Sequence, residues 1–346
     1  MLVWSFAVYA PSLGNHFALD DGLVAKAWLD ADRPNPMIRE LQPLGAYFRS
    51  NYWAGRGMAS PLYRPVTILS YAWTHRLFDG QSIGAEAFPH HLINVLLHML
   101  AVWLVYRLLR AVSCPRALSV IGALVFALHA IHSEVVATIV GRAELLGFCF
   151  GAGALLFGVR GLERSWPKAL PRFVAAALLF FLAFCSKENA LAWAAFLPVF
   201  LGARRRTAAR SPRIFWTSTL PLGAVLLWLV LRTEMIQGLA SEPEAIGYLA
   251  NPLAFEEPLA RITTAVAIWG YGLYKTLLPF SLAGEYGPPV FPILHGIFKP
   301  RFLAAALVLL AVFALSIRVA SRRPLCFLGM ATFLGFGFLT SNVPLA

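Results

Sequence analysis

The chain has 346 residues, of which 59% are hydrophobic and only 13% are charged, and its mean hydropathy is +0.67. A soluble domain is about half apolar and about a quarter charged, so this composition excludes a soluble globular protein and a disordered one. The 29 Lys and Arg residues exceed the 17 Asp and Glu residues, which leaves a formal net charge of +12. Such an excess suggests nucleic-acid binding in a soluble chain but basic loops on one face in a membrane protein.

Apolar runs that are long enough, or nearly long enough, to span a bilayer follow one another along the chain. They lie at about 1–14, 90–110, 117–135, 142–160, 169–186, 189–203, 213–231, 301–318 and 324–341. Another run, 259–280, is interrupted by Arg261 and Lys275. The strands of a transmembrane β-barrel would be about 10 residues long with alternating polarity. These runs have neither property, so a β-barrel is excluded. The sequence therefore predicts an all-α integral membrane protein.

Basic residues concentrate in four short connections between these runs, at 107–116, 160–172, 204–213 and 318–323. Together the connections carry 15 Lys and Arg residues and a single acid, Glu163. Cytoplasmic loops are enriched in Lys and Arg, so this pattern places all four connections in the cytoplasm. Most of the net charge therefore reports membrane topology, and we expect no nucleic-acid partner.

The parity of the crossings determines how the remaining run is interpreted. The helix at 213–231 runs outward and the one at 301–318 runs inward, so a single crossing at 259–280 would break the order. We therefore expect 259–280 to be a re-entrant or interfacial helix. The prediction is a single domain, 1–346, with about nine crossings and large outer loops at 15–88 and 232–300. The first loop is expected to hold amphipathic helices, whose Tyr and Trp side chains, such as Tyr63, Tyr71 and Trp73, form an interfacial belt.

Ionisable residues from five separate segments lie at the outer membrane level. They are Asp20, Asp21, His90, His91, His129, His132, Glu134, Arg142, Glu144, Lys187 and Glu188. Charges near the bilayer are costly and usually face a polar cavity. This clustering is the strongest functional signal in the sequence and predicts an active site on the outer side.

Each of these residues also has a structural interpretation. The pair Asp20 and Asp21 is typical of a turn or helix cap. His129 and His132 share a helix face and, with Glu134, leave a divalent metal site open, or they could be interface histidines. Adjacent residues do not face each other on a helix, so we expect Lys187 and Glu188 to have different partners. The Arg142 side chain could instead reach lipid headgroups.

Acids and cations beside a membrane suit a phosphorylated lipid substrate. Arg or Lys can bind the phosphate and stabilise it as a leaving group, while a carboxylate accepts the proton of an acceptor hydroxyl. This combination describes glycosyl transfer from a polyprenyl-phosphate sugar. The sequence contains no Walker A loop, HExxH, GxSxG or dinucleotide fingerprint that would suggest another reaction.

Several motifs in one order carry a family resemblance. They are Asp20-Asp21, SPLYRPVTILSYAW at 60–73, FPHHLINVLLH at 88–98, FALHAIHSEVVATIVGRAELLG at 126–147, SKENALA at 186–192, NPL at 251–253, ARITTA at 260–265, LLPFSLAGEYGPPVFP at 277–292 and SNVP at 341–344. Together they resemble the transmembrane-and-TPR-repeat (TMTC) family of O-mannosyltransferases and their bacterial relatives. That family is placed in the GT-C class of membrane glycosyltransferases.

The resemblance implies a fold, a reaction and a set of site residues. The fold is a GT-C multi-helix bundle, and the reaction is inverting transfer of mannose from a dolichyl- or polyprenyl-phosphate carrier to a Ser or Thr hydroxyl. Asp20 or Asp21 would be the catalytic base. The carrier phosphate would bind to Arg64, Arg142 and Lys187. The cavity would be lined by His91, His129, His132, Glu134, Glu144, Glu188 and Tyr286.

The family's C-terminal TPR region is expected to be absent here, because no 34-residue repeat occurs in this sequence. The acceptor is therefore open between a protein and a glycolipid or cell-wall polymer. Composition favours a bacterial plasma membrane over the endoplasmic reticulum membrane, with the site extracytoplasmic or luminal in either case. A transporter or flippase is the remaining alternative, although the polar residues stay at the outer rim and no inverted repeat is evident.

Overall fold

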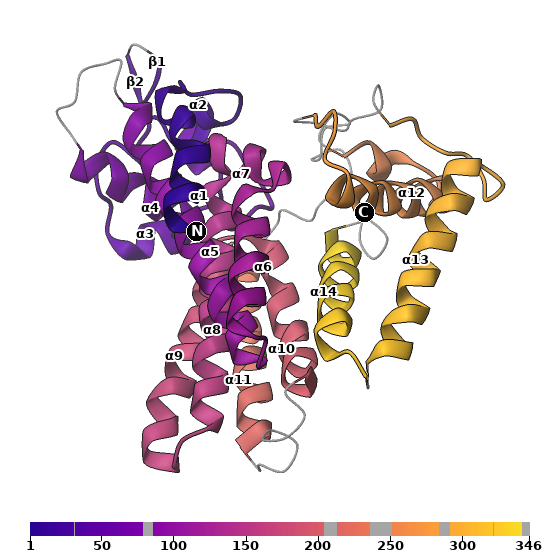
Figure 1. Ribbon diagram of the computed structural model, residues 1–346. Coiled ribbons are helices and arrows are strands. Elements are labelled where there is room, and N and C mark those ends of the chain that lie inside the picture. The colour runs from indigo at the N-terminus through magenta and orange to yellow at the C-terminus, as the bar shows by residue number, and fades with distance from the viewer. Residues whose placement is uncertain are drawn as a thin grey trace. The chain divides into compact units, whose positions relative to one another are not determined.

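The computed structural model describes residues 1–30, 32–78, 86–203, 213–235, 251–283, 291–320 and 322–340. The chain divides into two compact units, Met1–Leu197 with Arg206–Ala240 and Pro198–Arg205 with Ser241–Ala346. Helices make up most of the described residues (Figure 1). Among those residues the strands β1 (Trp28–Asp30) and β2 (Arg33–Pro34) pair in one antiparallel ladder. The prediction of an all-α chain is therefore confirmed apart from this short hairpin.

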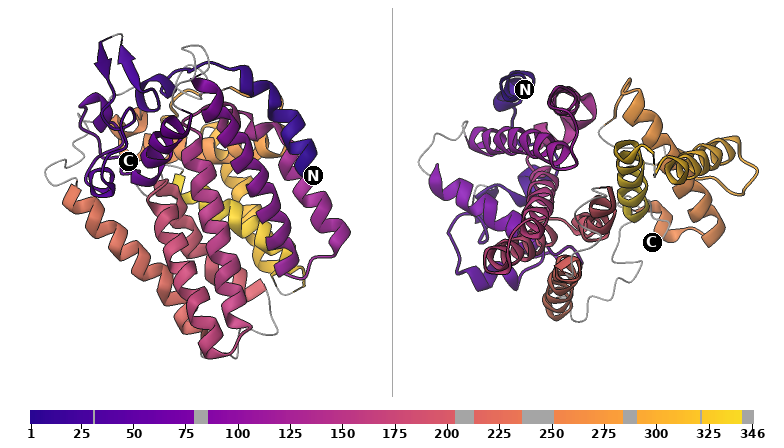
Figure 2. Two further views of the ribbon diagram at one scale, coloured as in Figure 1. Left: turned by 90° about the vertical axis from the view of Figure 1, so that its left-hand side faces the viewer. Right: turned by 60° about the horizontal axis from the view of Figure 1, so that its bottom comes forward.

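A bundle of long helices forms the first unit, with a smaller cap of loops and short helices at one end (Figure 2). Its helices include α1 (Leu2–Tyr9), α5 (Ala87–Ala111), α6 (Arg116–Leu128), α7 (Ser133–Ala137), α8 (Arg142–Leu162), α9 (Trp166–Phe184) and α11 (Arg213–Met235), and α10 (Ala192–Ala203) begins in this unit. Helix α8 is central because it packs against both α5 and α9. Small residues allow this close packing: Gly161 of α8 lies against the ring of Phe173 in α9.

The apolar run predicted at 117–135 is broken in the structure. Helix α6 ends at Leu128, His129 takes an extended conformation, and the chain resumes as a short 3₁₀ turn followed by α7. The two parts meet at an angle of 47°. This bend directs α7 toward the capping loops at one end of the bundle.

Four helices in the described part of the chain are long and apolar enough to cross a membrane, or five if the bent α6–α7 pair is one span. The four are α5, α8, α9 and α13 (Pro300–Val319). The predicted count of nine crossings is therefore not confirmed. Helix α12 (Pro258–Leu277), which coincides with the run expected to be re-entrant or interfacial, is not among these candidates.

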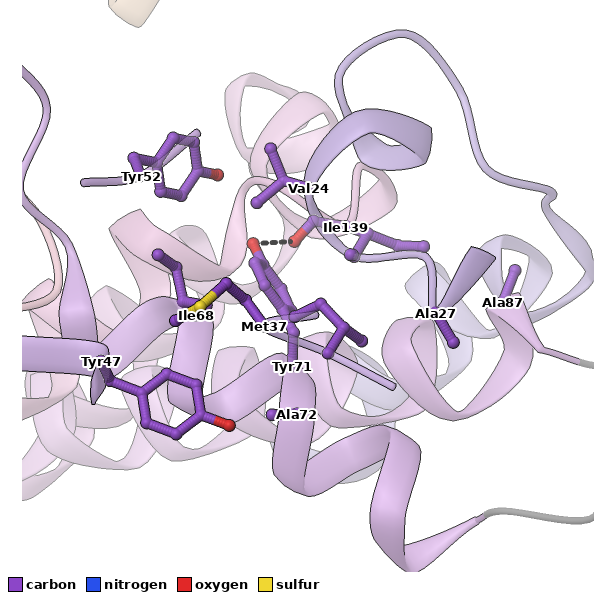
Figure 3. Packing of buried hydrophobic residues seen from close by; sticks show 12 residues of the cluster. Val24, Ala27, Met37, Tyr47, Tyr52, Ile68, Tyr71, Ala72, Ala87 and Ile139 are labelled. Atoms are coloured by element: carbon purple, nitrogen blue, oxygen red, sulfur yellow. Dashed lines mark hydrogen bonds between the residues drawn. The ribbon is translucent and has the colours of Figure 1, made fainter. Parts of the chain in front are cut away.

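The first outer loop folds into a compact cap with a core of its own. It contains α2 (Asp21–Val24), α3 (Leu44–Phe48), a 3₁₀ turn (Ala54–Arg56) and α4 (Pro65–Leu77). Figure 3 shows Tyr47, Ile68 and Tyr71 packed in this core, where the Tyr71 hydroxyl donates to the carbonyl of Ile139 at 3.2 Å. The predicted interfacial belt is wrong for Tyr63 and Tyr71, which are fully buried, whereas Trp73 is 47% exposed.

Three helices, α12, α13 and α14 (Pro324–Thr340), make up most of the described part of the second unit. Each begins with a proline, whose missing N–H and fixed φ suit the first position of a helix. In Figure 1, α12 runs across the direction of α13. The segment before α13 is fastened to α12, since the Thr263 hydroxyl donates to the carbonyl of Leu294 at 2.6 Å.

Candidate active site

A polar cavity of about 190 Å³ lies in the first unit, where the capping loops meet the bundle. Five residues predicted from the sequence line it, namely Asp20, Arg64, Glu134, Glu144 and Lys187. They come from four parts of the chain: the start of α2, the start of α4, the α7–α8 region and the turn after α9. The remaining lining residues are Tyr52, Trp53, Leu62, Val135, Thr138, Val140 and Gly141.

Arg64 is held rigidly at the cavity wall. Its Nε and Nη2 atoms both lie 2.9 Å from Glu188 Oε2, and its guanidinium carbon lies 4.8 Å from the centre of the Tyr52 ring. Burial is the largest single influence on the pKa of Arg64 and lowers it. The charges of Glu188, Tyr52 and Glu144, together with the hydrogen bond to Glu188, outweigh burial, so the net pKa is raised above its ordinary value. Arg64 therefore stays charged under all ordinary conditions.

The backbone around Arg64 explains why it meets Glu188. The first turn of α4 is joined to the turn after α9, because Val66 N–H donates to Cys185 O at 3.1 Å and the Thr67 hydroxyl donates to Ser186 O at 2.8 Å. Glu188 also accepts from the Tyr63 N–H at 3.2 Å through Oε1. Both carboxylate oxygens of Glu188 are thus engaged. Glu188 was predicted to line the cavity, but it contacts Arg64 and is not among the lining residues.

Lys187 forms the second ion pair of the site. Its Nζ atom lies 2.6 Å from Glu144 Oε1, and the side chains of Lys187 and Glu144 are 19% and 40% exposed. The prediction that Lys187 and Glu188 have different partners is confirmed. The reason is local: Lys187 has extended φ and ψ, so successive side chains point to opposite sides of the backbone.

Asp20 and Asp21 occupy contrasting environments. Asp21 is 1% exposed, and its carboxylate accepts from the N–H of Val140 at 2.8 Å and from that of Ala18 at 3.3 Å. Asp20 is exposed and lines the cavity. The preceding residue, Leu19, has φ of 46°, which is rare for a residue other than glycine. The carboxylate bonds of Asp21 therefore hold a strained turn that presents Asp20.

Arg142 does not reach the cavity. Its side chain is completely buried, and all three guanidinium nitrogens donate hydrogen bonds. Nε donates to Asn94 Oδ1 at 2.9 Å, Nη1 to Thr74 Oγ1 at 2.8 Å and Nη2 to the His90 carbonyl at 2.8 Å. It therefore joins α8 to α4 and α5 and cannot reach lipid headgroups.

The predicted histidines His91, His129 and His132 are not among the residues that line the cavity. His91 is fully buried in α5, whereas the partly buried His129 and His132 have ring centres 6.1 Å apart at the α6–α7 bend. Glu134 follows them but lines the cavity instead. Among the described residues, no three His, Cys, Asp or Glu side chains come together as a metal site would require. The trio of His129, His132 and Glu134 thus forms no metal-binding cluster here.

Tyr286, which was predicted to line the cavity, lies outside the described residues. Sequence reasoning also overlooked several residues that shape the site. Tyr52 is buried in the cavity wall, and burial raises its pKa to about 12. Its phenol is therefore a neutral hydrogen-bond donor beside Arg64. Asn94 and Thr74, which hold Arg142, carry no charge that would have marked them in the sequence.

Several known proteins that resemble the chain are named protein O-mannosyl-transferases. The chain is 28% identical over 290 residues to the protein O-mannosyl-transferase F38B6.6 of Caenorhabditis elegans. The matched region covers 82% of this chain and 38% of that relative. It is 33% identical over 183 residues to the human protein O-mannosyl-transferase TMTC1, covering 50% of this chain and 19% of the relative. The chain is 26% identical over 309 residues to mouse TMTC2, and the match covers 83% of this chain and 35% of that relative.

No family model matches the chain, and no solved structure matches it. The chain spans well under half the length of the curated relatives it matches. These relatives nevertheless confirm the resemblance expected from the motifs: the chain is a homologue of the TMTC-type protein O-mannosyl-transferases.

Proposed function

We propose that this protein is a membrane glycosyltransferase of the GT-C class. It transfers a sugar, mannose by analogy with the names of its relatives, from a polyprenyl- or dolichyl-phosphate carrier to a Ser or Thr hydroxyl of a protein. The observation that carries the proposal is the cavity in which an exposed carboxylate, Asp20, lies with two cations, Arg64 and Lys187. The proposed site faces the extracytoplasmic or luminal side.

In the proposed reaction, the acceptor oxygen attacks the anomeric carbon of the sugar on the face opposite the phosphate. The bond between that carbon and the phosphate oxygen breaks, and its electron pair leaves with the phosphate, so the configuration inverts. Asp20 accepts the hydroxyl proton as a general base, a role that typically contributes about 10²–10⁴-fold to the rate. Asp21 acts indirectly, because its two backbone hydrogen bonds fix the turn that carries Asp20.

The departing phosphate is assigned to Arg64 and Lys187. Charge-assisted hydrogen bonds from such cations are strong and develop fully as negative charge gathers on the leaving oxygen. Ligand pockets usually measure about 300–1,000 Å³, so a cavity of about 190 Å³ suits the phosphate and reacting carbon rather than the whole donor. We assign Arg142 a structural role in place of the phosphate contact expected from the sequence, since its guanidinium is buried and fully bonded.

The decisive experiment compares the two neighbouring aspartates in the full chain reconstituted in lipid. Labelled polyprenyl-phosphate mannose is supplied with a Ser/Thr peptide library, and transfer is counted on the peptides. Asp20→Asn should lower transfer by about 10²-fold or more without lowering the thermal midpoint of unfolding. Asp21→Asn should lower the thermal midpoint, because a buried charge-assisted bond worth about 1.5–3 kcal/mol is weakened.

Full transfer by the Asp20→Asn protein would refute the base assignment. A glycolipid or cell-wall acceptor in parallel reactions tests the acceptor, and labelling of that acceptor alone would overturn the protein-acceptor proposal. Repeating the assay with a chelator measures any requirement for a divalent cation. Solute uptake into the vesicles without sugar transfer would favour a transporter over an enzyme.

A further inference from the structure

A second, larger hollow lies within the second unit, between α12, α13 and the segment that leads into α13. It is a groove of about 520 Å³. Its walls come from Tyr271, Tyr274 and Leu277 of α12, Val308 of α13 and Phe291 of the leading segment. The volume falls within the range of about 300–1,000 Å³ that is usual for ligand pockets.

The close approach of the two helices explains the groove. A Cβ atom added to Gly270 would lie 2.5 Å from the Cβ of Ala305, so the backbones of α12 and α13 nearly touch there. Small residues bring crossing helices together in this way, and bulky aromatic side chains beside the contact then stand as walls. The groove is therefore a consequence of the helix crossing in the second unit itself.

The surroundings of the groove indicate what it binds. Arg301 is the one charged side chain among the described residues that line it, and its guanidinium carbon lies 5.5 Å from the centre of the Phe291 ring. Arg301 is exposed at the start of α13, a candidate membrane span of which only 17% is buried within the protein. From 258 to 340, the described residues include seven Lys and Arg and no Asp or Glu.

We propose that this groove binds an anionic glycerophospholipid, with one acyl chain along the aromatic walls and the phosphate against Arg301. An apolar groove with one exposed cation among its described lining residues matches a lipid that has a hydrocarbon chain and one negative charge. A cation beside an apolar membrane-facing surface attracts an anionic lipid headgroup by direct Coulomb interaction. The inference is independent of the proposed glycosyl transfer, because all the residues that carry it belong to the second unit.

Lipid retention by the purified full chain tests the proposal. The protein is equilibrated in detergent with equal amounts of phosphatidylglycerol, phosphatidylcholine and polyprenyl phosphate, and bound lipids are counted by native mass spectrometry. The wild-type protein should retain phosphatidylglycerol in preference to the other two. Arg301→Gln should weaken that retention about 5-fold, the effect expected from one cation beside an anionic lipid.

Two matched controls separate the groove from general surface effects. Arg318→Gln removes the same charge at the other end of α13 and should leave retention unchanged. Ala304→Trp fills the groove and should abolish retention, whereas Ala314→Trp, on the exposed surface of α13 but outside the groove, should not. Equal binding of phosphatidylcholine, preferential binding of polyprenyl phosphate, or equal loss in the Arg318→Gln or Ala314→Trp proteins would each overturn the proposal.

Discussion

Asp20 and Asp21 are neighbours in the chain but lie in different environments. The Asp21 carboxylate is buried and both its oxygens accept backbone hydrogen bonds, so it is occupied with holding the turn. The Asp20 side chain is exposed to the cavity. Residue type alone cannot separate them. The backbone N–H groups of Ala18 and Val140 bond to Asp21, and this contrast is why we propose Asp20 as the base.

Arg142 makes a residue-scale prediction about stability. Lysine in its place keeps the charge but has no planar fork, so several of the acceptors on Asn94, Thr74 and His90 lose their donor. Each unsatisfied buried group costs about 1–3 kcal/mol, and we expect Arg142→Lys to destabilise the protein by about 3 kcal/mol or more. The measurement is the thermal midpoint in detergent micelles.

Arg116 offers the matched control. It also begins a helix, α6, but it is exposed, so Arg116→Lys should change the stability by less than about 0.5 kcal/mol. Equal thermal midpoints for the two Lys variants would show that the buried network around Arg142 contributes nothing beyond its charge.

At the scale of elements, the connection between α7 and α8 organises the cavity. Three consecutive residues have separate tasks: Val140 donates to Asp21, Gly141 lines the cavity, and Arg142 fastens α8 to α4 and α5. The connection is tight, because a Cβ atom on Gly141 would lie 2.0 Å from the carbonyl oxygen of Val135. Any residue other than glycine at position 141 would force the backbone of Val135 or of residue 141 to move.

Gly141→Ala should therefore disrupt the site. The displaced turn would move Val140 away from Asp21, and we expect a loss of about 1–3 kcal/mol in stability, as for overpacking, together with loss of the proposed transfer. Gly153→Ala, in the helix that follows, is the control, because its Cβ would meet only Leu179 Cδ1 at 3.5 Å. That variant should be neutral or more stable by up to about 1 kcal/mol, since alanine favours helix. A tolerated Gly141→Ala would refute this account of the turn.

At the scale of the whole molecule, the charge distribution predicts which side of the membrane each helix end faces. Ser133 and Ser165 are both exposed and lie before and after α8, a candidate span. If α8 crosses the membrane with the basic connection inside, the two serines lie on opposite sides. In a background without the four native cysteines, Ser133→Cys should react with an impermeant maleimide added outside intact cells. Ser165→Cys should react only after the membrane is opened, and labelling of both from outside would contradict the predicted topology.

Hydropathy predicted the positions of the helices well because the signal is contained in each segment. The bend at His129, the burial of Tyr63 and Tyr71 and the environment of Arg142 could not be predicted in that way, since each depends on partners from elsewhere in the chain. Because charges near a bilayer are costly, the sequence did predict that Asp20, Glu134, Glu144 and Lys187 form one group. In the structure these four residues line one cavity. The role of each residue in that group stays a prediction.

The two ion pairs of the cavity have a consequence for selectivity among the anions of the cell. Arg64 and Lys187 each already hold a carboxylate, so an incoming anion must compete with Glu188 and Glu144 before it gains either cation. Free phosphate or a passing headgroup has only its charge with which to compete. The proposed sugar-bearing carrier would bring additional contacts through its sugar and its hydrocarbon chain. In the resting site, the carboxylates of Glu188 and Glu144 therefore compete with other anions for Arg64 and Lys187. We expect inorganic phosphate at millimolar concentrations to inhibit the proposed transfer only weakly.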